Sequence, residues 1–76
     1  MRILDEARNQ SIDSVLLMLT PNEAAELASK MRSLDVETGE HLHINDVTYQ
    51  WEIKVAVYTP ENLKYFSPEI KKLLEE

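Results

Sequence analysis

One stretch decides the fold class of this chain: residues 41–57, HLHINDVTYQWEIKVAV. From Gln50 to Val57, polar and apolar residues alternate, which is the pattern of a half-buried β-strand. Leu42 and Ile44 alternate with polar neighbours in the same way. The stretch therefore predicts two short strands in sequence, the second clearer than the first.

A turn centred on Asp46 and Val47 would join these strands into a hairpin. In this register apolar side chains meet apolar ones and polar meet polar, whereas a slip of one residue would mix the two faces. Trp51 then lies on the apolar face, where we expect it to be part of the core. The expected pairs are Ile44 with Tyr49, Leu42 with Trp51, His43 with Gln50, and His41 with Glu52.

Upstream, residues 12–19 predict a further strand that is apolar on both faces. Alternation places its apolar side chains on opposite sides, with Val15, Leu17 and Leu19 on one and Leu16 and Met18 on the other. A strand with two apolar faces is either central in a sheet or covered by another molecule.

Two helices follow from capping patterns. Thr20 and Glu23 form a capping box around Pro21, so a helix starts there and ends near Ser33 or Leu34. Its apolar stripe is Ala24, Leu27, Ala28, Met31 and Leu34. Later, Thr59-Pro60 predicts a short helical turn, and Ser67-Pro68 starts a last helix whose apolar side is Ile70, Leu73 and Leu74.

The element order is strand, helix, strand, strand, helix. We expect an α+β fold in which one antiparallel or mixed sheet of three or four strands carries the helices on one face. With 76 residues, the chain 1–76 is expected to be a single domain. Residues 1–10 are either an edge strand or a frayed terminus.

Composition excludes several classes of function. The chain has no cysteine, which removes disulfide scaffolds and thiolate metal sites. Its net charge is −6 and its basic residues are scattered, which argues against nucleic-acid binding. The longest apolar run, Val15–Leu19, is too short for a membrane span, and no secretory signal precedes it, so we expect a cytoplasmic protein.

His41 and His43 are two residues apart on a strand, so their rings share one face. With Glu52 set opposite His41, this face is a candidate site for a divalent metal. The commoner arrangement is a cross-strand ion pair between His41 and Glu52. We expect neither a cofactor nor catalysis, because the single glycine, Gly39, supports no phosphate-binding loop and no nucleophile motif is present.

We find no motif of a known family, and the residues by themselves name no specific activity. The leading hypothesis is a small acidic, non-enzymatic interaction or regulatory module that binds itself, as a homodimer, or another protein. Its interface would be an apolar sheet face formed by Leu16, Met18, Ala56 and Tyr58. The alternatives are a metal-binding protein that uses His41 and His43, and an inhibitor similar to immunity proteins or antitoxins that binds a basic partner.

Overall fold

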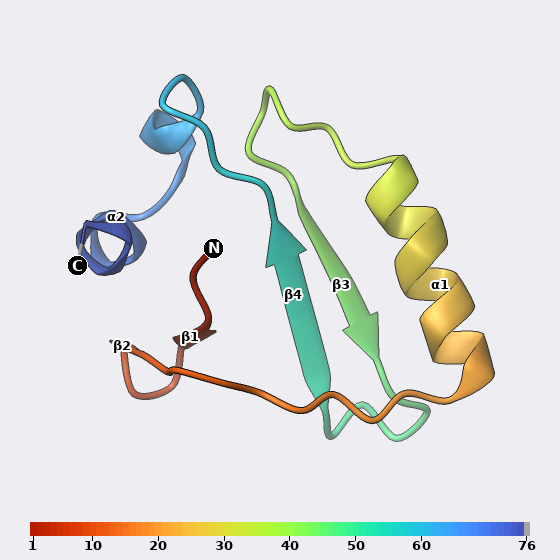
Figure 1. Cartoon of the computed structure of the whole chain (residues 1–76). Coiled ribbons are helices and arrows are strands. Elements are labelled where there is room, and N and C mark those ends of the chain that lie inside the picture. The colour runs from red at the N-terminus through yellow and green to blue at the C-terminus, as the bar shows by residue number, and fades with distance from the viewer. Residues whose placement is uncertain (76) are drawn as a thin grey trace.

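The computed structural model describes residues 1–75 and shows a small α+β fold with two helices and two antiparallel two-stranded sheets (Figure 1). Glu76, the last residue of the expected domain, lies outside the described residues. The elements are β1 (Leu4–Asp5), β2 (Gln10–Ser11), α1 (Pro21–Arg32), β3 (His41–Asn45), β4 (Glu52–Ala56), the 3-10 helix η1 (Leu63–Tyr65) and α2 (Pro68–Leu74).

Both helices begin where the capping patterns predict. The Thr20 hydroxyl accepts from the Glu23 N–H at 3.2 Å, and the Glu23 carboxylate accepts from the Thr20 N–H at 2.9 Å, so the capping box is complete. At α2, the Ser67 hydroxyl accepts from the Ile70 N–H at 3.2 Å. Local side-chain chemistry therefore sets both helix starts, because it satisfies backbone N–H groups that the first turn leaves unpaired.

The hairpin forms, but its register differs from the expected one by four residues. Ile44 pairs with Ile53 rather than Tyr49, and Leu42 pairs with Val55 rather than Trp51. Because the shift is an even number, the faces keep their residues and apolar still meets apolar. Trp51 leaves the core, and its side chain is 73% exposed.

Asp46 explains the longer loop between β3 and β4. Its carboxylate accepts from the N–H groups of Gln50, at 2.9 Å, and Trp51, at 3.1 Å, and from the Thr48 hydroxyl. Tyr49 takes a left-handed φ of 57° inside this loop. The side chain of Asp46 thus closes a wide turn that the alternation of apolar residues does not reveal.

The expected single sheet of three or four strands does not form, because residues 12–19 do not join the hairpin. They are followed by α1 and show no regular pairing, while β1 and β2 make a separate small sheet. The outer edge of β3 is occupied by α1, whose Lys30 ammonium donates to the His43 carbonyl oxygen at 2.7 Å. An apolar sequence favours an extended backbone, but it does not select the strand with which that backbone would pair.

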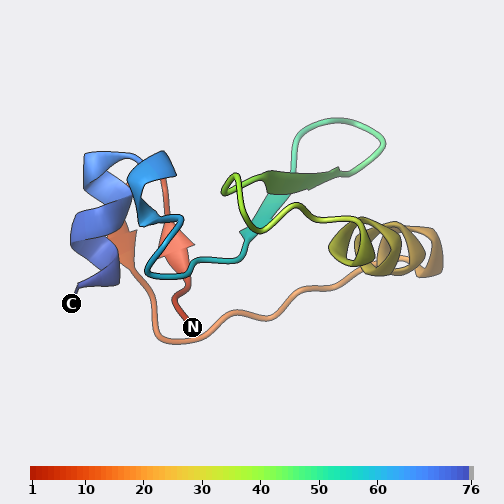
Figure 2. The ribbon, with the colours of Figure 1, turned by 90° about the horizontal axis from the view of Figure 1, so that it is seen from above.

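The helices also do not share one face of the sheet. Figure 2 shows α1 on one side of the β3–β4 hairpin and α2, with β1 and β2, on the other. The buried apolar side chains gather around the hairpin and the C-terminal elements: Leu42, Ile44, Phe66 and Leu73. The helix α1 contributes no buried residue, so it covers β3 with only part of its apolar stripe.

Asn62 is the one buried polar side chain among the described residues, at 2% exposure. Its amide donates to the carbonyl oxygens of Val36, at 2.7 Å, and Val57, at 2.9 Å, and its side-chain oxygen accepts from the Thr59 N–H at 2.8 Å. These bonds tie the loop after α1 to the end of β4. Because every polar atom of the side chain has a partner, its burial stabilises the fold rather than opposing it.

Candidate interaction site

The longest run of consecutive exposed apolar side chains among residues 1–75 is the one that links β2 to α1. We call residues 14–20, SVLLMLT, the interaction segment. Exposed fractions alternate along it: 53% at Val15, 81% at Leu16, 46% at Leu17, 83% at Met18 and 37% at Leu19. This alternation is typical of a strand, with odd-numbered side chains turned toward the rest of the chain and even-numbered ones turned to solvent.

The backbone of this region is also unpaired. Within residues 1–75, none of the N–H or C=O groups of residues 13–19 makes a hydrogen bond to another part of the protein. The nearest such bonds lie at its ends, from Ile12 N–H to Ile3 at 2.9 Å and from Ala24 N–H to Thr20 at 2.9 Å. An extended run with apolar side chains and unpaired backbone groups is a template for pairing with another strand.

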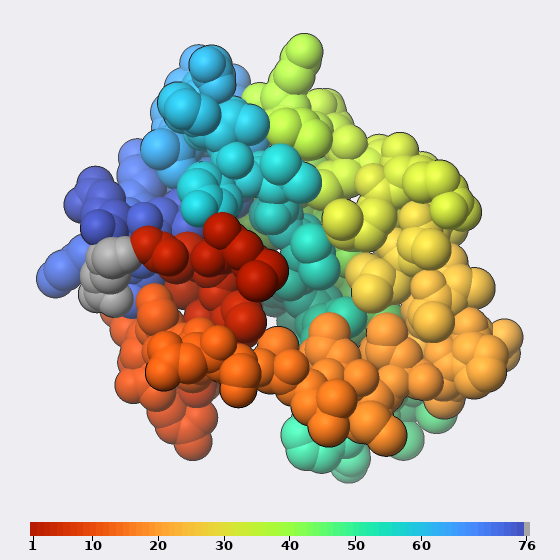
Figure 3. Space-filling model, viewed as in Figure 1, coloured from red at the N-terminus to blue at the C-terminus, as the bar shows by residue number. Residues whose placement is uncertain are grey.

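The interaction segment lies on the surface of the molecule. Figures 1 and 3 show it, in orange, running in front of one end of the β3–β4 hairpin towards α1. Leu16 and Met18 do not share a sheet face with Ala56 and Tyr58, since only Ala56 of the four belongs to a strand. Ala56 is half-buried and Tyr58 is 41% exposed.

The two histidines have different neighbours. The His43 Nδ1 lies 3.3 Å from a Glu52 carboxylate oxygen, whereas the ring of His41 packs edge-on against Phe66, with centroids 5.5 Å apart. The contact with Glu52 that the sequence predicts for His41 is thus made by His43, because the register has moved. Among residues 1–75, no three His, Cys, Asp or Glu side chains are grouped so as to hold a metal ion.

A chain of charged side chains continues from His43 across β4. Glu52 lies 3.8 Å from the Lys54 ammonium, which in turn lies 3.1 Å from Glu6 in the turn between β1 and β2. The hydrogen bond that the Lys54 ammonium donates to the Glu6 carboxylate, together with the negative charge of that carboxylate, raises the pKa of Lys54. These side chains are well exposed, so the contacts orient the β1–β2 hairpin more than they stabilise it.

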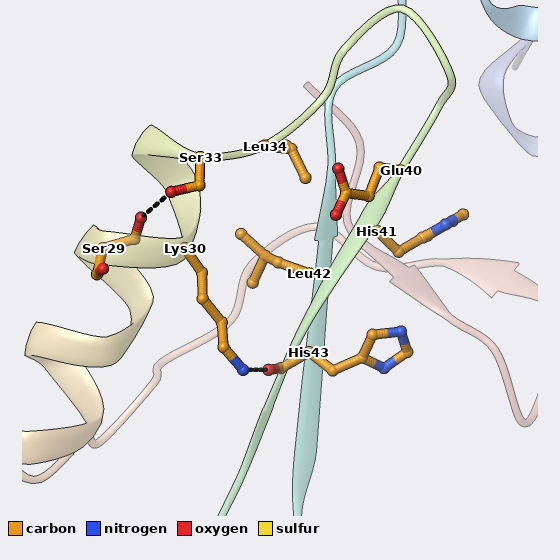
Figure 4. Close-up of a pocket in the computed structure, with 8 residues that line it drawn as sticks. All are labelled: Ser29, Lys30, Ser33, Leu34, Glu40, His41, Leu42 and His43. Carbon is orange, nitrogen blue, oxygen red and sulfur yellow. Dashed lines mark hydrogen bonds between the residues drawn. The ribbon is translucent and has the colours of Figure 1, made fainter.

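A groove of about 340 Å³ lies between α1 and β3 (Figure 4). Two polar side chains on its α1 side are engaged within the chain: Lys30 bonds His43 and Glu26, and the Ser33 hydroxyl donates to the Ser29 carbonyl oxygen. In Figure 4 the rings of His41 and His43 point away from α1. The two imidazole rings therefore do not face the polar side chains of α1 across the groove.

Comparisons with protein-family models, with curated proteins and with solved structures find no significant match to this chain. Within residues 1–75, no helix combines the length and the apolar character needed to cross a membrane. The site is therefore interpreted from its own geometry.

The sequence predicts Leu16 and Met18 as interface residues and sets Val15, Leu17 and Leu19 on the opposite side of the expected strand. The structure leaves all five of these side chains at least partly exposed. One sequence signal points to the whole interaction segment: from Ser14 to Thr20 no residue is charged, in a chain that is otherwise rich in charge.

Proposed function

We propose that this chain is a small protein-interaction module that acts by binding and not by catalysis. Its binding element is the interaction segment, which adds as a β-strand to another protein chain. One observation carries this proposal: five consecutive apolar side chains stand exposed on a strand-like backbone whose N–H and C=O groups are unpaired. Burial of both the side chains and the backbone groups against one partner is the arrangement that strand addition provides.

The energetic reason is the cost of leaving these groups in water. Fully burying a Leu or Met side chain is worth about 1.5–3 kcal/mol each, and the segment holds three Leu, one Val and one Met. The main-chain hydrogen bonds supply affinity and the side chains on the outward face, Leu16 and Met18, supply specificity.

Amide hydrogen exchange tests the proposal. In a dilute solution of the monomer, the amides of residues 13–19 should exchange as fast as those of an unstructured peptide, while the amides between β3 and β4 are protected. In the assembled state the amides of the segment should become protected. Protection of residues 13–19 already in the monomer would mean that the chain covers the segment itself, and the proposal would fail.

A pair of double variants distinguishes binding through the interaction segment from non-specific association of exposed apolar side chains. Leu16→Asp with Met18→Asp should abolish the protection gained on assembly and leave the far-UV circular dichroism unchanged. Val47→Asp with Tyr49→Asp places the same charges on two other exposed side chains, at 95% and 80% exposure, and should leave assembly intact. Equal loss in both variants would contradict the assignment to the interaction segment.

A further inference from the structure

The partner of the interaction segment can be inferred from the segment itself. We propose that it is the interaction segment of a second copy of this chain, paired antiparallel across a two-fold axis at Leu17. This inference rests on the proposed function, because it names the partner of the same site. Three observations carry it: self-complementarity, the absence of charge, and the amount of surface left exposed.

The interaction segment is self-complementary when it is turned end to end. In an antiparallel pair centred on Leu17, a hydroxyl side chain lies opposite a hydroxyl side chain at each end. Between the ends, every apolar side chain lies opposite another apolar side chain. The pairs are Ser14 with Thr20, Val15 with Leu19, Leu16 with Met18, and Leu17 with its own copy. A two-fold interface requires that one surface fits itself in this manner.

The charge pattern permits this pairing although each copy carries a net charge of −6. No charged residue lies between Ser14 and Thr20. Asp13 comes to lie opposite Pro21, so it meets no like charge, and Pro21 ends the ladder because it has no N–H to donate. Like charges directly across a strand pair are destabilising, and this register contains none.

The chain exposes more surface area than a folded monomer of its mass, and the excess is of the size that a dimer interface buries. The chain of 8.8 kDa exposes 6141 Å², whereas a folded monomer of that mass is expected to expose about 4,800 Å². The excess of about 1,300 Å² is of the size that each subunit of an obligate dimer buries, about 1,000 Å² or more. Backbone pairing of two segments buries part of this area, because it sets Leu16 of one copy beside Met18 of the other on one face and the odd-numbered side chains of both copies together on the other face.

Single-cysteine variants test the register, because the chain has no cysteine of its own. Leu17→Cys brings two thiols to positions whose Cα atoms lie about 5 Å apart, within reach of a disulfide. Asp13→Cys places them about 26 Å apart in the antiparallel pair, at 3.3 Å per residue. Val47→Cys, on a side chain that is 95% exposed, controls for random collision.

With oxidised glutathione, Leu17→Cys should form a covalent dimer at least tenfold faster than Asp13→Cys or Val47→Cys. Light scattering of the unmodified chain should show a dimer at high concentration. Equal rates for Leu17→Cys and Asp13→Cys would overturn the antiparallel register in favour of a parallel pair. Fast dimer formation by Val47→Cys would show that the interface lies at the β3–β4 loop and would overturn the proposal.

Light scattering also separates this inference from the proposed function. A monomer at every concentration, with the amides of residues 13–19 unprotected, would overturn the second copy as partner and direct the search to a different protein, such as one with a basic surface. A monomer with those amides protected would overturn both proposals.

Discussion

Residues 1–34 and residues 39–73 use their apolar side chains in opposite ways. Every buried residue among the described ones lies in the second region, and residues 1–34 contain none. The first region nevertheless carries the longest apolar run of the chain, Val15–Leu19. The difference teaches that apolar composition does not build a core unless the fold supplies a partner surface.

The dimensions of the molecule agree with this contrast. The radius of gyration is 13.2 Å, whereas the radius of gyration expected for a folded chain of this length is about 11 Å. The second region packs the β3–β4 hairpin against the C-terminal elements, while the first extends around it (Figure 2). The proposed dimer would stabilise this open region, because a partner that binds only the folded state shifts the equilibrium toward it.

The largest expected loss in the free energy of unfolding comes from shortening a buried side chain of residues 39–73. Ile44 is 3% exposed, so Ile44→Ala should lower the free energy of unfolding by about 3 kcal/mol through lost burial and a cavity. Leu16→Ala, on a side chain that is 81% exposed, should change it by less than about 0.5 kcal/mol in the monomer. Urea unfolding of both variants below the association concentration measures the contrast, and equal losses would refute it.

A somewhat smaller loss in the free energy of unfolding is expected when the hydrogen bonds of Asn62 are removed. Asn62→Ala removes a side chain that bonds Val36, Val57 and Thr59, so it leaves partly buried backbone groups without these partners. We expect a loss of about 2–3 kcal/mol in urea unfolding. Asn22→Ala, at an exposed position of α1, is the matched control and should be close to neutral. A neutral Asn62→Ala would mean that the loop after α1 is not held by this side chain.

The smallest effect is a pH dependence of the β3–β4 loop. Hydrogen bonds from the Thr48 hydroxyl, and then from the N–H groups of Trp51 and Gln50, hold the pKa of Asp46 below its ordinary value. The carboxylate thus favours the folded loop at pH values above the ordinary Asp pKa of about 3.9, and this contribution is lost as the pH falls through the lowered pKa.

The fluorescence of Trp51 reports this transition, since the residue lies at the end of the loop. We expect its emission to be constant from neutral pH down to the ordinary Asp range and to change only below it. Asp46→Asn should remove the transition. A change that begins well above that range, or one that persists in Asp46→Asn, would assign it to another group.

Part of the fold could be predicted because it depends on neighbouring residues in the sequence. The starts of α1 and α2 follow from Thr20 and Ser67, whose hydroxyls accept from N–H groups three residues ahead, and from Glu23, whose carboxylate accepts from the N–H of Thr20 three residues back. The alternation of apolar residues determines which side chains share each face of the hairpin, and the change of register leaves this division unchanged. The alternating exposure of the interaction segment follows from the same period of two.

Other features could not be predicted because they depend on distant contacts. Asp46 selects a wide loop by bonding Gln50 and Trp51, and this moves every pair of the hairpin by four residues. Residues 12–19 stay outside the sheet, and α1 rather than a further strand lies beside β3. Both outcomes depend on which groups meet in space, which the pattern of apolar residues does not specify.

The sequence by itself determined where the helices begin, which residues share a strand face and that the run from Val15 to Leu19 is apolar on both sides. Only the tertiary structure decided that this run stays unpaired, that His43 rather than His41 meets Glu52, and that Asn62 joins the loop after α1 to β4. The physical reason is that capping and alternation are satisfied within a few residues, whereas strand pairing and burial require a partner brought in by the rest of the fold.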